Sequence, residues 1–298
     1  MSRSHLATDV EALSKGYTAG RRAMDTVVIV LFFVLEAFVL YRSLPFIGDR
    51  PFVSVVIAFI GYVAADFMSG LVHWIGDTWG DPSMPIVGQY FIRPFREHHV
   101  DQAAITRHNF TETNGANSLA TMVVLLPTVL LLYGVNTPTV LAFHLFAFAM
   151  SIGVFGTNQF HKWSHLSDER CPWIVRRLQA MGVILRPEHH SKHHAAPYDR
   201  YYCITVGWLN PVLAKMRFFR MAEKIIQKGT GAIPRKNDIV LTATQTASKV
   251  VAKVEGVVGE VREQVGGAIG EVKEGVVGAI GEVGEALDEA MYPKQKTT

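Results

Sequence analysis

Four apolar segments occupy much of the first 160 residues, at Thr26 to Leu44, Phe52 to Trp74, Ser118 to Val135 and Thr139 to Phe160. Each is close to the ~20 residues that a membrane-spanning helix needs. Short connections, Pro45 to Pro51 and Asn136 to Pro138, join them into two helical hairpins with tight loops on one side of the membrane. We therefore expect an all-α integral membrane protein, a four-span helical bundle with its longer polar segments on the other side.

Basic residues flank these segments unevenly, and they favour the cytoplasmic face of a membrane. Arg42 and Arg50 are the basic residues on the hairpin side. The other side has Arg3, Lys15, Arg21 and Arg22 before the first span, and Arg176, Arg177, Arg186, Lys192, Lys215, Arg217 and Arg220 after the fourth. The first apolar run is too long for a cleaved signal peptide. We expect a multi-pass protein of the bacterial inner membrane or endoplasmic reticulum, with both termini and the histidine-rich loops cytoplasmic.

Two uncharged or mixed segments follow the fourth span. Residues Cys171 to Leu185 combine Trp, Leu and Ile with paired Arg, which is typical of a helix lying in the membrane interface. Residues Tyr201 to Leu213 are aromatic and uncharged, which fits either a lid or re-entrant cover over a lipid pocket or a helix packed on the bundle. Glu36 and Asp66 lie inside apolar runs, where ionisable groups usually face the protein interior. We expect a polar contact between the first two helices in preference to a substrate or proton role.

The pattern changes after the membrane domain, which we place at residues 25–235 between a cytoplasmic segment, 1–24, and a tail, 236–298. From Gly256 the tail repeats every eleven residues, with new copies at Gly267 and Gly278. Eleven residues are close to three helical turns, so the Val and Ile residues return to one face and the Glu residues to another. Each Gly costs about 1 kcal/mol relative to Ala in a helix. The tail is expected to be an amphipathic or disordered appendage that is dispensable for chemistry.

The composition of the chain limits the partners and the kinds of metal site that we expect. The chain is 49% hydrophobic and 18% charged, with a formal charge of +3, and we expect no nucleic-acid partner. Its two cysteines, Cys171 and Cys203, are isolated, which argues against a disulfide framework or a thiolate metal site. Its twelve histidines, in contrast, cluster just beyond the apolar runs.

The histidine spacing predicts a metal site at the cytoplasmic ends of the helices. Residues four apart lie on one face of a helix, so His73 with Asp77, and His161 with His165, can each chelate an ion. The candidate ligands are His73, Asp77, His98, His99, His161, His165, His190, His193 and His194, with His108 and His189 as further or outer ligands. Glu97, Asp101 and Glu188 could orient ring N–H groups from outside the coordination sphere. His144, inside the fourth span, is expected to be a packed residue.

The number of candidates implies two ions. A catalytic zinc ion takes three protein ligands and a structural one takes four, so about nine ligands are too many for one ion. Imidazole suits zinc, copper and iron, and iron fits best if the chemistry is oxidative.

Five motifs carry a resemblance to a known family: His73-Trp-Ile-Gly-Asp, Arg93-Pro-Phe-Arg-Glu-His-His, Arg107-His-Asn-Phe-Thr-Glu, His161-Lys-Trp-Ser-His and Tyr202-Cys-Ile-Thr-Val-Gly-Trp-Leu-Asn. Together they resemble the plasmanylethanolamine desaturase family, including the CarF-type proteins, within the membrane fatty-acid desaturase and hydroxylase superfamily. The resemblance covers about Asp66 to Gly231 and leaves the tail outside. It implies a di-iron site in which His108 joins the histidine boxes as a ligand, whereas His189 stays the weakest candidate.

The resemblance also implies an activity. The substrate would be a 1-O-alkyl ether phospholipid, and O₂ with an external electron donor would convert the alkyl chain to a vinyl ether, which makes a plasmalogen. Electrons would come from a cytochrome b5, ferredoxin or flavodoxin type of carrier. Two alternatives stay open: a di-iron desaturase of another lipid, such as the acyl chain of phosphatidylglycerol, and a non-catalytic membrane metal-binding protein.

Overall fold

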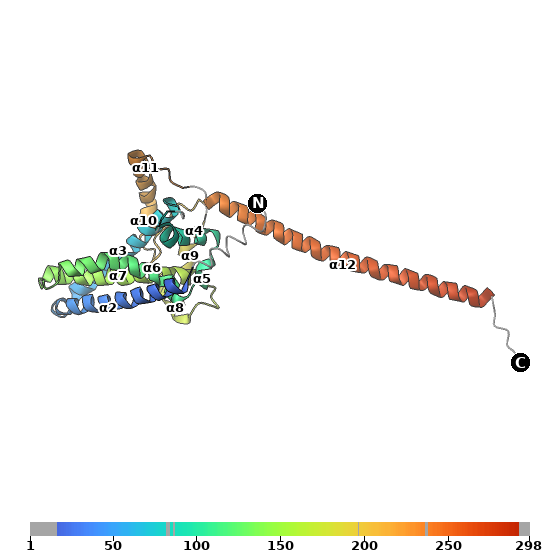
Figure 1. The fold of residues 1–298 in the computed structure, drawn as a ribbon, viewed down its shortest axis with the longest axis horizontal. Coiled ribbons are helices and arrows are strands. Elements are labelled where there is room, and N and C mark those ends of the chain that lie inside the picture. The colour runs from blue at the N-terminus through green and yellow to red at the C-terminus, as the bar shows by residue number, and fades with distance from the viewer. Residues whose placement is uncertain (1–16, 82–83, 86, 196, 236–237, 292–298) are drawn as a thin grey trace. The chain divides into compact units, whose positions relative to one another are not determined.

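The computed structural model describes residues 17–81, 84–85, 87–195, 197–235 and 238–291, and these form helices and loops (Figure 1). The helices are α2 Ala19–Asp49, α3 Pro51–Thr78, the π-helix η1 Gly88–Ile92, α4 Arg93–Val100, α5 Ala104–Arg107, α6 Phe110–Leu131, α7 Pro138–Ser164, α8 Trp173–Met181, α9 Pro187–His190, α10 Asn210–Lys215, α11 Phe218–Thr230 and α12 Asp238–Met291. The chain divides into two compact units between Leu241 and Thr242.

Four of these helices, α2, α3, α6 and α7, are long and apolar enough to cross a membrane. This confirms the four predicted spans, but two boundaries differ. Helix α2 continues through Pro45 to Asp49, so the expected loop from Pro45 to Pro51 is reduced to a turn at Arg50. Helix α6 begins at Phe110, eight residues before the predicted span, because the Asn109 side chain accepts a hydrogen bond from the Glu112 backbone N–H at 3.0 Å and caps the helix.

Helix α7 lies at the centre of the bundle and packs against α2, α3 and α6. Small residues allow its close approach to α3: a Cβ atom added at Gly61 would lie 2.6 Å from the Phe146 carbonyl oxygen, and one at Gly153 would lie 2.5 Å from the Ala65 Cβ. Close backbone packing at small residues is how helices associate in lipid. The ends of α3 and α7 are thereby brought together, which positions their terminal histidines.

The segment before α10 is a buried loop and not the packing helix of the second alternative. Tyr202 to Val206 are buried but not helical, and the helix starts only at Asn210. The Asp66 carboxylate accepts hydrogen bonds from the backbone N–H groups of Val206 and Gly207, at 2.8 Å each, and of Leu209 at 3.1 Å. The expectation that Asp66 joins the first two helices is therefore wrong, because its carboxylate satisfies the backbone donors of a buried loop.

A second buried carboxylate also differs from its predicted role. Glu36 of α2 accepts a hydrogen bond from the Ser151 hydroxyl of α7, so it links the first and fourth spans and not the first and second. The predicted interfacial region does contain a helix, α8, which covers nine residues of it.

Candidate metal centre

Nine side chains that could bind metal converge where α3 and α7 end. The first group is His98, His161, His165, His190 and His194; the second group is His73, Asp77, His99 and His193. Within each group the potential ligand atoms all lie within 4.8 Å of one another. These are the eight histidines and one aspartate selected from the sequence, and the structure divides them into two sets.

Each set draws on distant parts of the chain. Helix α3 supplies His73 and Asp77, α4 supplies His98 and His99, and the end of α7 supplies His161 and His165. Helix α9 and the turn after it supply His190, His193 and His194. The two predicted i, i+4 pairs are formed, with His73 Nε2 at 3.2 Å from Asp77 Oδ2 and His161 Nε2 at 3.3 Å from His165 Nε2.

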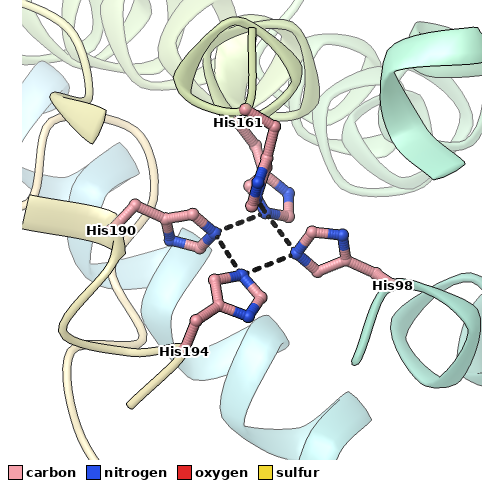
Figure 2. A group of neighbouring side chains, drawn as sticks. His98, His161, His190 and His194 are labelled. Atoms are coloured by element: carbon pink, nitrogen blue, oxygen red, sulfur yellow. Dashed lines mark hydrogen bonds between the residues drawn. The ribbon is translucent and has the colours of Figure 1, made fainter. Parts of the chain in front are cut away.

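Four histidines of the first group, His98, His161, His190 and His194, point their Nε2 atoms toward one another (Figure 2). The Nε2 atom of His161 lies 2.8 Å from that of His190 and 3.0 Å from that of His98, and the Nε2 atom of His194 lies 2.9 Å from both. A neutral imidazole has one N–H donor and one acceptor nitrogen, so each Nε2 can be a donor or an acceptor but not both. A cation at the centre would satisfy all of these nitrogens at once.

Burial keeps these rings in the form that binds metal. Burial first, and neighbouring histidines second, place the pKa of His98 and His190 well below the usual range and lower the pKa of His165 to about 4. The rings are therefore neutral near pH 7, with a lone pair available for a metal ion.

The second group gives a stronger indication of a metal site. The Nδ1 atoms of His73 and His193 lie 3.0 Å from the carbonyl oxygens of Tyr202 and Arg200, which can only accept, so Nδ1 is the protonated nitrogen in each ring. Their Nε2 lone pairs then point at the Asp77 carboxylate, at 3.2 and 3.3 Å. A cation shared by these acceptor atoms would stabilise the arrangement, so the donor set fits a metal ion.

The loop that supplies these carbonyls is itself fixed. Tyr198 and Tyr201 adopt left-handed backbone conformations with φ of 61° and 64°, on either side of Arg200. Such conformations cost of order 1 kcal/mol each for residues other than glycine. Asn210 holds Cys203, the residue after Tyr202, through hydrogen bonds of 2.8 Å to its N–H and carbonyl. These ring partners could not be found from the sequence, because they are backbone carbonyls, which every residue has.

The remaining candidates lie outside both groups. The ring Nε2 of His108 is 3.8 Å from Glu112 Oε1, and His189 packs against the Tyr201 ring with a centroid distance of 5.0 Å. Asp101 pairs with Arg107 at 2.6 Å and accepts from the Ala103 N–H. Glu188 is exposed, His144 is buried within α7, and the side chain of Glu97 falls outside the described part of the structure.

A cavity of about 470 Å³ adjoins the first group. His98 and His161 line one end, and Leu125, Thr128 and Phe143 line the other. Along α7 the lining runs from Phe143 to His161, which corresponds to ~27 Å of helix. The cavity therefore joins the candidate metal centre to the apolar interior of the bundle.

Comparisons with known proteins agree with this arrangement. Residues 62–237 match the lipid desaturase domain, which excludes the tail. The chain is 47% identical over 233 residues to plasmanylethanolamine desaturase of Myxococcus xanthus, covering 78% of this chain and 81% of that protein. It is 43% identical over 230 residues to plasmanylethanolamine desaturase 1 of Mus musculus, covering 75% and 83%.

A plant relative is more distant. Fatty acid desaturase 4, chloroplastic, of Arabidopsis thaliana is 36% identical over 178 residues, covering 59% of this chain and 53% of that protein. No solved structure matches the chain. The domain match and the two long alignments establish that the chain belongs to the lipid desaturase family.

Proposed function

We propose that this protein is an O₂-dependent di-iron desaturase that converts the 1-O-alkyl chain of an ether phospholipid, plasmanylethanolamine, to the vinyl ether of a plasmalogen. The observation that carries the proposal is the pairing of two ligand groups with an apolar cavity, in a chain 47% identical to a plasmanylethanolamine desaturase. The reaction removes two hydrogens from adjacent carbons, and O₂, two electrons and two protons yield two waters.

The five histidines of the first group would hold one iron ion, and His73, Asp77, His99 and His193 the other. When bound, the two ions supply the strong oxidant that an unactivated C–H bond requires. The carbonyls of Tyr202 and Arg200 orient two of the ligands by accepting their Nδ1 protons.

The protein's further contribution is placement of the lipid. Because only the first group reaches the cavity, through His98 and His161, the chain carbons to be oxidised would lie beside that group. The side chains of α6 and α7 that line the apolar end would hold the rest of the alkyl chain and exclude water.

Electrons would come from a separate carrier of the cytochrome b5, ferredoxin or flavodoxin type. The site and both termini would face the cytoplasm, where Arg176, Arg177 and Arg186 offer a basic surface to an acidic carrier. Activity with such a carrier is expected to fall as salt rises.

A second candidate substrate is an acyl chain of another lipid, such as phosphatidylglycerol. The similarity to a protein named fatty acid desaturase 4 favours it, although the alignment covers only 53% of that protein. A non-catalytic metal-binding role would leave the cavity beside His161 unexplained.

The deciding experiment is purification of the full chain in detergent, with metal analysis, followed by turnover of an alkyl ether phospholipid with O₂ and an electron donor. Two irons per chain and an acid-labile vinyl ether product are expected. One zinc ion per chain would contradict the proposal, and product from acyl lipid only would select the second candidate.

A further inference from the structure

The charged residues of the cavity lie at one end. Among the described residues that line it, the formally charged ones are Arg21, Arg93 and Glu112. They come from the first turn of α2, the start of α4 and the first turn of α6. With Tyr17 and His108, which also line the cavity, they form what we call the polar end.

Packing contacts draw two members of the polar end, Arg21 and Glu112, toward one another. Arg21 Nε lies 3.0 Å from Asp25 Oδ2, one helical turn further along α2. A Cβ atom added at Gly115 of α6 would lie 2.4 Å from the Asp25 Cγ, so α2 and α6 are in close contact there. Glu112 is one turn before Gly115, and the contact therefore brings Arg21 and Glu112 to the same part of the cavity.

Tyr17 joins the same environment. Its pKa is raised to about 12, first because the phenol is buried and then because the carboxylates of Asp25 and Glu112 lie nearby. The hydroxyl therefore stays protonated and can donate a hydrogen bond.

The polar end is adjacent to the first metal group. Lys162 directly follows His161, and its Nζ donates a hydrogen bond to the His108 carbonyl. The His108 ring faces Glu112, with 3.8 Å between Nε2 and Oε1. His108 thus contacts the residue after His161 through its carbonyl and Glu112 through its ring, and it lines the cavity.

This arrangement matches a zwitterionic headgroup. We infer that the polar end binds the phosphoethanolamine group of the substrate, with Arg21 and Arg93 facing the phosphate and Glu112 facing the ammonium. The inference rests on the proposed function, because the carbons to be oxidised are joined to the ether oxygen, only a few bonds from the phosphate. A headgroup held here places those carbons beside His98 and His161 and directs the rest of the chain toward Phe143. Arginine and carboxylate side chains are suited to these two groups.

The test is equilibrium binding of isotope-labelled ether lipids to the full chain in detergent, without turnover. Three lipids share one alkyl chain and carry phosphoethanolamine, phosphocholine or a bare phosphate. Wild-type protein is expected to bind the phosphoethanolamine lipid about tenfold more tightly than the bare phosphate lipid, as one charge-assisted contact predicts. The phosphocholine lipid should bind more weakly than the phosphoethanolamine lipid, since its ammonium has no N–H to donate.

Two variants and a control locate the site. Glu112→Gln is expected to weaken binding of the phosphoethanolamine lipid about tenfold and leave the bare phosphate lipid unchanged. Arg93→Gln should weaken both lipids alike. The control is Glu169→Gln, which changes an exposed carboxylate outside the cavity and should change neither.

Equal binding of all three lipids by wild-type protein would overturn the inference, as would a Glu112→Gln protein that keeps the preference for ethanolamine. If Glu112→Gln fails to fold, unchanged lipid binding by Arg93→Gln overturns it instead. Failure of the proposed function would show separately, as absence of vinyl ether product from a wild-type protein that still discriminates between headgroups.

Discussion

In the unit that ends at Leu241, histidine, aspartate and serine side chains are buried, whereas in the second unit the valines of α12 are exposed. His73, Asp66 and His193 have no exposed surface, yet each has polar contacts. Val257, Val265 and Val276 along α12 are more than half exposed. The first unit thus buries polar groups that orient the candidate metal ligands and stabilise a loop. In the second unit, the described valines form an apolar face that the unit itself does not bury.

The contrast shows what each unit's polar residues do. A buried polar group is costly unless it is paired, and in the first unit the pairs are backbone donors, carbonyls and other ligands. In α12, by contrast, the side chains of Glu260, Glu263, Glu271 and Lys273 are exposed. Function should therefore be sensitive to single changes in the first unit and insensitive to removal of the second.

The largest effect is expected from removing a ligand. His190→Ala takes one of five donors from the first group, and it should reduce bound iron and lower turnover by at least about a hundredfold. The matched control is His189→Ala, which changes the adjacent histidine outside both groups. Metal analysis and lipid turnover are measured for both variants. Equal iron content in the two would contradict the assignment of His190, and not His189, as a ligand.

Chelation tests the same centre without mutation. Stripping metal from the wild-type protein should abolish turnover, and Fe²⁺ alone should restore it. Restoration by Zn²⁺ would contradict an oxidative role for the site.

A smaller effect is expected from Asp66→Asn. The carboxylate accepts three backbone N–H bonds from the loop that orients His73, and an amide of the same shape offers one oxygen. The free energy of unfolding should fall by about 3 kcal/mol. Thermal unfolding in detergent measures it, with Asp49→Asn, at the exposed end of α2, as the control. Equal melting temperatures for the two variants would show that the Asp66 carboxylate does not stabilise this loop.

A change at the apolar end should alter selectivity. Ala147→Leu adds volume where α7 lines the cavity, so lipids with long alkyl chains should lose activity before those with short chains. Ala142→Leu lies on the same helix outside the cavity wall and serves as the control. Turnover of a chain-length series measures the effect, and an unchanged profile would place the alkyl chain elsewhere.

The smallest effect is expected from deleting residues 242–298. Since the domain match ends at residue 237 and the nine ligands precede it, iron content and turnover should stay at the wild-type level. A large loss of iron on deletion would show that the tail is needed for iron binding.

Much of the fold could be read from the chain. Apolar runs of membrane length predicted four spans, because hydrocarbon thickness sets the length of a spanning helix. Helical spacing predicted that His73 would meet Asp77 and that His161 would meet His165, because such pairs depend only on local geometry. Helix ends were less accurate, since the Asn109 cap and the tolerance of α2 for Pro45 are local details that hydropathy does not report.

The sequence by itself selected the candidate ligand types and their number, and on that number we predicted two ions. Only the tertiary structure decided which ligands group together, that His108 faces Glu112, and that Asp66 holds the loop after Tyr201. These outcomes depend on contacts between residues far apart in the chain, such as His98 with His194. Such contacts follow from how α3, α4 and α7 pack, and no local pattern in the sequence encodes them.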